Sequence, residues 1–538
     1  MKKCGGMIIT VFVMILMVSI EIECTNKVKD VQIITDTESG KVEGNKEANG
    51  IYSFKGIPYG ASTEPPLRWK PPESPLAWAP NVLDCKNYRS ICPQTPSERF
   101  PLSNMSESCL HLNIWTPDYE VSSLKPVYVF IHGGFFIEGA GSDILWSGEF
   151  AIEQSGDAVV IVTMNYRLGP LGYLNSEELG FEGNYGFQDT IFALQWIQRN
   201  IANFGGDPNQ VTISGQSAGA MMIGLHLIRN TSQVLFHNAV MESAPMGILF
   251  RYPSENIPYT SKFVNLMNCN TNTVSCLNTV SWTTIITAQA SREFILTLPI
   301  NTTEIMFWQP VIDGKLIPAQ PIDALVSMKF SRPIPLLIGT VRNETARFIP
   351  TVNLNKLEYE RLVHSQFVSL SSQVLSLYPS SHPTLASPDV NRIQLIALQT
   401  DYLWICPSRL IAQHHSISSP TFSYAFMHLP SFDPINYQSK WCIGAVCHSS
   451  ELPYVFFSQN GAYFNSTLES NLSNEMVSDW FSSFSRQHFS STQLWTPVSP
   501  FASSSNMTTF FYDIPSSSPQ IGYRSYFCNF WDNVGYIY

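Results

Sequence analysis

The chain has 538 residues, of which 44% are hydrophobic and 14% are charged, and this composition suits a large globular protein with an extensive core. Its formal net charge is -11, so it lacks the basic surface on which nucleic-acid binding depends, and we expect no nucleic-acid partner. An acidic surface mainly favours solubility.

The first 24 residues have the pattern of a secretory signal. Lys2 and Lys3 precede an apolar run, Met7–Ile20, which is short for a membrane span. We therefore expect residues 1–24 to be a signal peptide and residues 25–538 to form one secreted domain, with no later membrane span. A signal anchor is the alternative, and the sequence does not indicate the cleavage position.

A secretory route permits disulfides and N-glycosylation. Eleven cysteines are present. Six N-x-[ST] sequons agree weakly with this route, because such sequons also arise by chance. We expect glycans at some of these candidate positions: Asn104, Asn230, Asn301, Asn465, Asn471 and Asn506.

Residues 126–243 alternate short apolar runs with segments of helical periodicity. The apolar runs predict strands at Val127–Ile131, Ala158–Asn165, Val211–Ser214 and Ala239–Met241. Helical spacing predicts helices over 187–201 and Ala218–Arg229, and two later strands are predicted at Pro335–Gly339 and Phe422–Met427. Continuous apolar strands that alternate with helices indicate an α/β fold, with a mostly parallel sheet covered on both faces.

The segment VTISGQSAGA places Ser217 between a predicted strand and a predicted helix, inside Gly215–Gly219. A sharp strand-to-helix turn pushes the central side chain outward, and its flanking residues must be small because the turn is tight. The helix N-terminus also favours negative charge beside the serine. The pattern therefore predicts that Ser217 is a catalytic nucleophile, and an ordinary glycine turn is the alternative.

A serine that receives an acyl group needs hydrogen-bond donors for the oxyanion that develops on the substrate. The segment FIHGGFFIEG follows the predicted strand Val127–Ile131. The backbone N–H groups of Gly134 and Phe135, together with that of Ala218, are expected to form this oxyanion hole. A plain glycine turn after a strand is the alternative.

Residues 336–348, LLIGTVRNETARF, permit two interpretations. Asn343 begins an N-x-[ST] sequon, which would place it on an exposed loop. Glu344 instead follows a predicted buried strand, where an acid could belong to an active site. The local pattern alone does not decide between a sugar site and a catalytic carboxylate.

The chain resembles the type-B carboxylesterase/lipase family, which includes the cholinesterases. The resemblance covers most of the chain and implies an α/β-hydrolase fold. It rests on segments that follow one another in family order: FKGIPYG (54–60), SCLHLNIWTPD (108–118), MNYRLGPLGYL (164–174), NIANFGGDPNQVTISGQSAGA (200–220), PVIDGKLIP (310–318) and HSSELPYVF (448–456).

The resemblance implies a catalytic triad of serine, glutamate and histidine in that chain order. Ser217 matches the serine, and Glu344 matches the acid in a Gly-x-x-x-x-Glu segment that begins at Gly339. His448 matches the histidine that precedes a Glu-Leu-Pro-Tyr segment. Such a histidine would take the serine proton, and the acid would orient the imidazole and stabilise its charged form.

Other residues compete for these roles. His428, at the end of a predicted strand, is the main rival of His448. Glu451 could be taken for a further catalytic group, but a helix start or a packing contact is the preferred interpretation. A triad acid must be shielded from water, so we expect Asn343, beside Glu344, to carry no glycan.

The resemblance also implies three disulfides, Cys92–Cys109, Cys269–Cys276 and Cys406–Cys528. Cys85 is left over. Cys442 and Cys447 either pair or remain buried thiols, and we expect buried thiols. No histidine and cysteine spacing indicates a metal site.

Three departures from the family pattern concern substrate choice. Phe135 stands where many relatives carry glycine or alanine, and its ring is expected either to crowd the acyl side of the pocket or to alter the conformation of the loop. Gln216 replaces a glutamate, and the loop between Cys92 and Cys109 lacks the choline-binding tryptophan of cholinesterases. The last two changes weaken recognition of a quaternary ammonium. The same loop is short and mostly polar, unlike a lipase lid.

The sequence therefore predicts a secreted serine carboxylesterase that hydrolyses small neutral esters through an acyl-serine intermediate, without a metal or organic cofactor. The partner is a small-molecule ester, and the oligomeric state is not indicated. A non-catalytic cholinesterase-like adhesion or binding protein is the alternative from another class, because fold alone does not prove activity. A lipase or cholinesterase is a narrower enzyme alternative.

Overall fold

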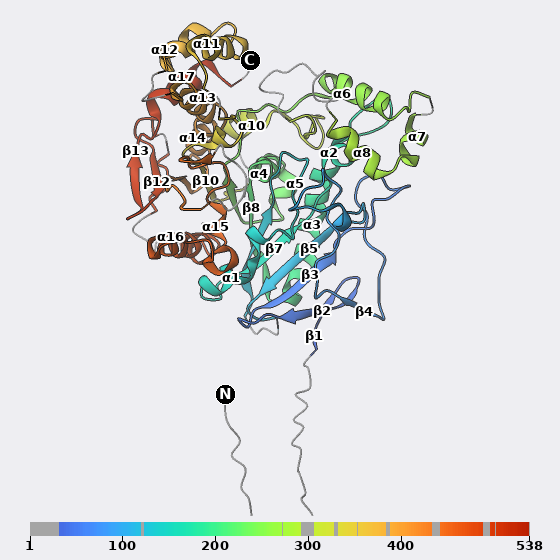
Figure 1. Ribbon diagram of the computed structural model, residues 1–538. Coiled ribbons are helices and arrows are strands. Elements are labelled where there is room, and N and C mark those ends of the chain that lie inside the picture. Colours follow the sequence, from blue (N-terminus) through green and yellow to red (C-terminus); the bar gives the residue numbers. More distant parts are fainter. Residues whose placement is uncertain are drawn as a thin grey trace, which may run out of the picture. The chain divides into compact units, whose positions relative to one another are not determined.

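A computed structural model describes residues 32–119, 123–271, 273–291, 306–327, 332–351, 353–383, 388–432, 442–487, 495–500 and 502–536 (Figure 1). The expected signal peptide and Asn301 lie outside these ranges. The chain from Ile33 to Tyr538 makes one compact unit. No helix in the described ranges is long and apolar enough to cross a membrane.

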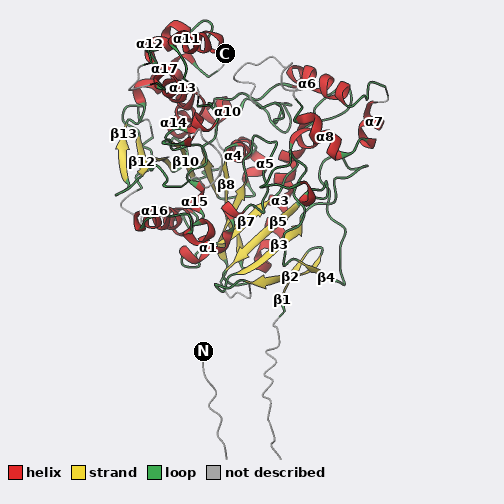
Figure 2. Ribbon diagram, viewed as in Figure 1, coloured by secondary structure: helices red, strands yellow, loops and turns green. Residues whose placement is uncertain are grey.

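A sheet of thirteen strands forms the centre of this unit, as Figure 2 shows in yellow. The strand order is β1-β2-β3-β5-β7-β6-β8-β9-β10-β11-β12-β13, and β4 pairs with β2. The neighbours from β7 to β12 are parallel, the other neighbours in this order are antiparallel, and β4 runs parallel to β2. The strands are β1 Ile33–Thr37, β2 Gly40–Lys46, β3 Tyr52–Pro58, β4 Val82–Asp84, β5 His111–Thr116, β6 Lys125–Ile131, β7 Val160–Met164, β8 Gly206–Gln216, β9 Asn238–Glu242, β10 Leu336–Val341, β11 Thr421–Phe426, β12 Thr508–Tyr512 and β13 Ser518–Ile521.

Helices cover both faces of the sheet (Figures 1 and 2). Successive side chains of a strand point to opposite faces, so Val127, Val129 and Ile131 of β6 join one hydrophobic core and Tyr128 and Phe130 join the other. The first core includes side chains of α3, α4 and α14, and the second includes side chains of α1, α15 and α16. Parallel strands that are apolar throughout require this double cover, which confirms the predicted α/β fold.

The described helices have the following bounds. They are α1 Gly148–Gln154, α2 Gly169–Tyr173, α3 Tyr185–Asn200, α4 Ala218–Ile228, α5 Asn230–Gln233, α6 Pro253–Leu266, α7 Thr273–Thr279, α8 Trp282–Gln289, α10 Pro321–Ser327, α11 Lys356–Gln366, α12 Ser371–Leu377, α13 Val390–Thr400, α14 Cys406–His415, α15 Leu452–Val455, α16 Thr467–Val477 and α17 Ser525–Val534. Two shorter helical segments matter for the site: the 3-10 turn η5, Glu344–Arg347, and the π-helical turn η6, Asp401–Ile405.

The predicted elements of residues 126–243 occur in the structure with shifted ends. The largest shift is in β8, which begins at Gly206 rather than at Val211. Three of residues 207–210 are polar, the fourth is proline, and none is buried, so hydrophobicity does not identify them as a strand. Pairing of Gly206 with Lys125 of β6 extends β8 towards its N-terminus.

Candidate active site

Ser217 lies in the turn between β8 and α4, with backbone angles of φ 58° and ψ −122°. A non-glycine residue adopts this conformation only when its surroundings impose it. The turn leaves no room for side chains at its flanks: a Cβ on Gly215 would lie 2.5 Å from the carbonyl carbon of Gly219, and one on Gly219 would lie 2.0 Å from the carbonyl oxygen of Ile131. The Ser217 N–H donates to the Glu242 carbonyl at 2.9 Å, which fixes the turn against β9.

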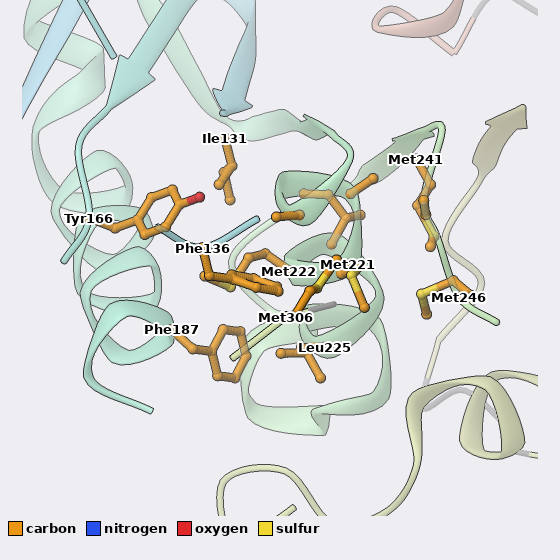
Figure 3. Close-up of a cluster of buried hydrophobic side chains, with 14 of the residues drawn as sticks. Ile131, Phe136, Tyr166, Phe187, Met221, Met222, Leu225, Met241, Met246 and Met306 are labelled. Carbon is orange, nitrogen blue, oxygen red and sulfur yellow. The ribbon is translucent and has the colours of Figure 1, made fainter. Parts of the chain in front are cut away.

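Helix α4 is buried along its whole length, and its packing fixes the position of Ser217. Figure 3 shows Met221, Met222 and Leu225 of α4 in a cluster that also contains Phe136 and Phe187. The long unbranched side chains of methionine fill irregular gaps, so this core adapts to the helix while it holds the helix N-terminus in place. Phe136 follows the loop expected to form the oxyanion hole, and the same core therefore anchors the serine turn and that loop.

The loop after β6 lies directly against the serine turn. A Cβ on Gly133 would lie 2.6 Å from the Gln216 carbonyl oxygen and 2.9 Å from Cβ of Ser217. Gly134, Phe135 and Phe136 all have positive φ, at 106°, 53° and 62°. Among the described residues, no hydrogen bond uses the N–H of Gly134 or Phe135, so both remain able to donate to a substrate.

Glu344 begins the η5 turn, three residues after the end of β10, and its side chain is completely buried. Its Oε1 accepts the Val341 N–H at 2.9 Å. Burial raises the pKa of the Glu344 carboxyl above its ordinary value, whereas the hydrogen bonds from Val341 and from the Ser243 hydroxyl oppose this rise. A third donor, the Nδ1–H of His448, lies against its other oxygen and favours the carboxylate over the neutral acid.

His448 connects the acid to the serine turn. Its Nδ1 lies 2.5 Å from Glu344 Oε2, and its Nε2 lies 3.1 Å from the side-chain nitrogen of Gln216, the residue before Ser217. Burial, and then the charge of Arg347, lower the pKa of His448 well below its ordinary value. A neutral imidazole with a carboxylate on Nδ1 keeps Nε2 unprotonated, which is the form that can accept a proton.

Aromatic rings surround the His448 imidazole. The rings of Phe348 and Trp404 lie 5.5 and 5.7 Å from it, measured between centroids. Phe135 packs edge-on against Phe348 at 5.2 Å, so its ring extends this aromatic wall from the loop after β6 to the histidine. The Trp404 indole N–H donates to the Ser243 carbonyl, which fixes the wall to the sheet. Sequence reasoning found Phe135 but missed Phe348, which directly follows η5, and Trp404, which lies on η6.

The rival histidine, His428, lies in a separate polar cluster. Its Nε2 is 3.1 Å from Glu469 Oε1, and the carboxylate of Glu469 also accepts hydrogen bonds from the Ser431 hydroxyl and the Tyr454 hydroxyl. Burial opposes ionisation of Glu469, but hydrogen bonds from the Ser431 hydroxyl and N–H, from His428 and from the Asn465 N–H lower its pKa to about 2. The serine of this cluster donates to the acid and not to the imidazole, so the arrangement does not activate a nucleophile.

Two further buried acids, Glu451 and Glu242, lie behind Glu344. The sequence did not predict that they would lie near the site. Glu451 precedes α15, as expected for a residue at a helix start, and its Oε1 also lies 3.4 Å from the Ser243 hydroxyl. Glu242 accepts the Ser214 hydroxyl at 2.6 Å. Burial raises the pKa of Glu451 to about 8, with the charge of Glu344 adding to the rise, and burial also raises the pKa of Glu242. Glu344 is the acid of this group that faces the imidazole.

The described part of the chain contains four disulfides. Three pair the cysteines that the family resemblance implies: Cys92–Cys109, Cys269–Cys276 and Cys406–Cys528. The fourth, Cys442–Cys447, corrects our expectation of buried thiols at these positions. The short turn between the two cysteines brings their Cα atoms to 5.7 Å, within the range for a disulfide, directly before His448. Cys85 is a buried free thiol.

Asn343 does not have the surroundings of a glycosylation site. It is half-buried, its N–H donates to the Val446 carbonyl, and its side-chain oxygen accepts the Val446 N–H at 3.2 Å. Both bonds join the turn before Glu344 to the loop that carries His448. By contrast, the asparagines of the five described sequons named above are exposed.

We predict that Asn343 carries no glycan, because a bulky sugar there would separate the two loops that bring Glu344 and His448 together. Intact-glycopeptide mass spectrometry of the protein from a glycosylating host should find the Asn343 peptide unmodified and glycans on some exposed sequons, which serve as the internal control. A glycan on Asn343 in active protein would contradict this placement of Glu344.

A serine on a strand–turn–helix elbow, above a mostly parallel sheet covered by helices on both faces, defines the α/β-hydrolase class. The sequence model of the carboxylesterase family matches residues 31–531, and the chain belongs to this family. It is 36% identical to the para-nitrobenzyl esterase of Bacillus subtilis (strain 168) over 445 residues, which cover 80% of this chain and 84% of that one. It is 32% identical to the cocaine esterase of Homo sapiens over 488 residues, which cover 83% and 82% of the two chains.

A solved structure of a thermophilic PNB esterase superimposes with a TM-score of 0.77 at 29% identity, covering 93% of this chain and 99% of that one. The protein is therefore a carboxylic ester hydrolase, and the expectation of an enzyme, rather than a non-catalytic adhesion protein, is confirmed.

Proposed function

We propose that Ser217, Glu344 and His448 form the catalytic triad of this esterase and that hydrolysis proceeds through an acyl-serine intermediate. The observation that carries the proposal is the imidazole of His448, which has a buried carboxylate on Nδ1 and the turn of Ser217 at Nε2. This is the arrangement that converts a weakly nucleophilic hydroxyl into an alkoxide-like attacker.

In the first half of the reaction, Oγ of Ser217 bonds to the ester carbonyl carbon while its proton passes to Nε2 of His448. The negative charge on the carbonyl oxygen is stabilised by the N–H groups of Gly134, Phe135 and Ala218. The bond to the leaving alcohol then breaks, and that oxygen takes the proton from Nε2. Water repeats these steps on the acyl-serine and releases the acid.

We propose small, neutral carboxylic esters as substrates. The aromatic wall of Phe135, Phe348 and Trp404 gives the proposed site an apolar surface on the side nearest to His448. Gln216 supplies no negative charge beside the serine. Both features support a neutral substrate over a quaternary ammonium ester. The exposed sequons and the disulfides support the further proposal that the protein follows the secretory route.

The test is a comparison of esters with the same acyl group. We expect the wild-type protein to hydrolyse p-nitrophenyl acetate and butyrate, and to show no strong preference for acetylthiocholine over its uncharged isostere 3,3-dimethylbutyl thioacetate. The readout is kcat/KM for each ester, measured at two ionic strengths so that long-range attraction is detected.

A small organophosphate should modify Ser217, with the site located by peptide mass spectrometry. A protein that is inert towards all these esters and unlabelled at Ser217 would overturn the proposed triad. A large preference for acetylthiocholine would instead overturn only the neutral-substrate proposal and favour a cholinesterase.

A further inference from the structure

The side-chain amide of Gln216 contacts Nε2 of His448, the nitrogen that must accept the serine proton in the proposed reaction. Its side-chain nitrogen lies 3.1 Å from Nε2 of the imidazole. Among the described residues, the Ser217 hydroxyl makes no hydrogen bond to this nitrogen. In the structure, the hydrogen-bond partner of the His448 base is therefore Gln216, the residue before the nucleophile, and not Ser217 itself.

The protonation of the ring determines which group donates. A carboxylate oxygen of Glu344 lies 2.5 Å from Nδ1, so Nδ1 carries the proton and Nε2 offers a lone pair. The Gln216 amide must therefore present its NH2 group to Nε2. The amide oxygen faces the other way, towards the oxyanion loop, where a Cβ on Gly133 would lie 3.0 Å from it.

The Gln216 backbone is fixed, so only its side chain can leave the imidazole. Gln216 is the last residue of β8 and pairs with Glu242 of β9. Its side chain is buried, and its carbonyl oxygen is packed against Gly133. Withdrawal of the amide from Nε2 therefore requires rotation of the side chain and no movement of the sheet.

We propose that Gln216 caps the catalytic base of the substrate-free enzyme: its amide donates to Nε2 of His448 and must rotate away before Ser217 can give its proton to that nitrogen. Gln216 is then a positioning residue that sets the fraction of enzyme ready to react. The inference rests on the proposed triad. A glutamate at this position could not act in this way, because a carboxylate has no proton to donate to a lone pair.

The cap also predicts how His448 titrates. The charged groups that face the imidazole are Glu344 and Arg347 of η5, with the buried Glu451 beyond Glu344, and all three stay the same when residue 216 is changed. An N–H that donates to Nε2 stabilises the neutral imidazole and so lowers its pKa. Removal of the amide should raise the pKa of His448, and a carboxylate in its place should raise it further by stabilising the imidazolium.

The experiment compares Gln216→Met, which has nearly the same length but no donor, and Gln216→Glu, which has nearly the same shape, with the wild type. Gln210→Met is the matched control, because Gln210 is exposed on the same strand. One readout is the rate at which a small uncharged organophosphate modifies Ser217. The other is the pH titration of the downfield proton NMR signal of the His448 Nδ1–H, which does not require activity.

A hydrogen bond of ordinary net strength corresponds to about a two- to tenfold change in a rate or equilibrium constant, so we expect Gln216→Met to be labelled about two- to tenfold faster. The His448 titration should move to higher pH in Gln216→Met and further in Gln216→Glu, with Gln210→Met unchanged. An unchanged titration together with unchanged or slower labelling of both variants would overturn the cap. Failure of wild-type Ser217 to be labelled would overturn the triad instead, and the NMR titration would still test the contact.

Discussion

Replacing Ser217 with alanine is expected to lower kcat/KM for p-nitrophenyl acetate by about 10⁵-fold, which corresponds to about 7 kcal/mol of lost transition-state stabilisation. The reason is that no other hydroxyl in the described structure lies in the turn beside the imidazole of His448. The proposed oxyanion donors remain in this variant and should leave some catalysis of direct attack by water. The change removes one buried oxygen from a turn fixed by glycines, so the fold should be preserved.

The control for this prediction is Ser254→Ala, which changes an exposed serine at the start of α6 and should keep full activity. Near-ultraviolet circular dichroism of both variants should match the wild type. Because triad residues act as a unit, addition of His448→Ala to Ser217→Ala should cost little more activity. Retention of more than about a hundredth of wild-type activity by Ser217→Ala would show that another group is the nucleophile.

Local sequence patterns predicted those parts of the site that depend on local backbone geometry. Gly215 and Gly219 are required because a Cβ at either position would meet neighbouring backbone atoms, and this requirement can be seen in the sequence. The strands β6, β7 and β9 were predictable for a similar reason, because their central residues are buried on both faces and are mostly apolar. The polar start of β8 was not predictable from hydrophobicity.

Contacts between distant segments were not predictable from local patterns. The family resemblance, and not any local pattern, separated Glu344 from the sugar-site interpretation and His448 from His428. Ser243 could not be found from the sequence, since its hydroxyl lies between Glu344 and Glu451 only after β9, β10 and the His448 loop assemble. The same holds for the amide of Gln216. The sequence showed that glutamine replaces a charged glutamate at this position, but the contact between the amide and the His448 imidazole can be seen only in the folded structure.

The Cys442–Cys447 disulfide shows a further limit. Two cysteines with four residues between them can be buried thiols or a bridge, and the choice depends on the turn between them. In the structure this turn ends directly before His448, so the bridge restrains the loop that carries the imidazole. The preference for thiols considered their burial alone and ignored the conformation of the turn.

Removal of the Cys406–Cys528 disulfide is expected to cause the largest loss of stability among the four. It joins the start of α14 to α17 and closes a loop with a sequence separation of 122 residues. By loop-closure entropy alone, such a bridge contributes about 5 kcal/mol to the free energy of unfolding. The double variant Cys406→Ala/Cys528→Ala should therefore unfold at a clearly lower urea concentration than the wild type.

The matched control is Cys269→Ala/Cys276→Ala, since this bridge closes a loop with a sequence separation of only 7 and contributes about 2.5 kcal/mol by the same argument. The ratio of the two losses tests the entropic explanation more sharply than either loss alone. Cys406 directly follows the η6 turn that carries Trp404, so we also expect activity of its double variant to fall at lower urea concentrations than global unfolding does. Equal stability losses in the two double variants would contradict the loop-entropy argument and would show that local packing dominates.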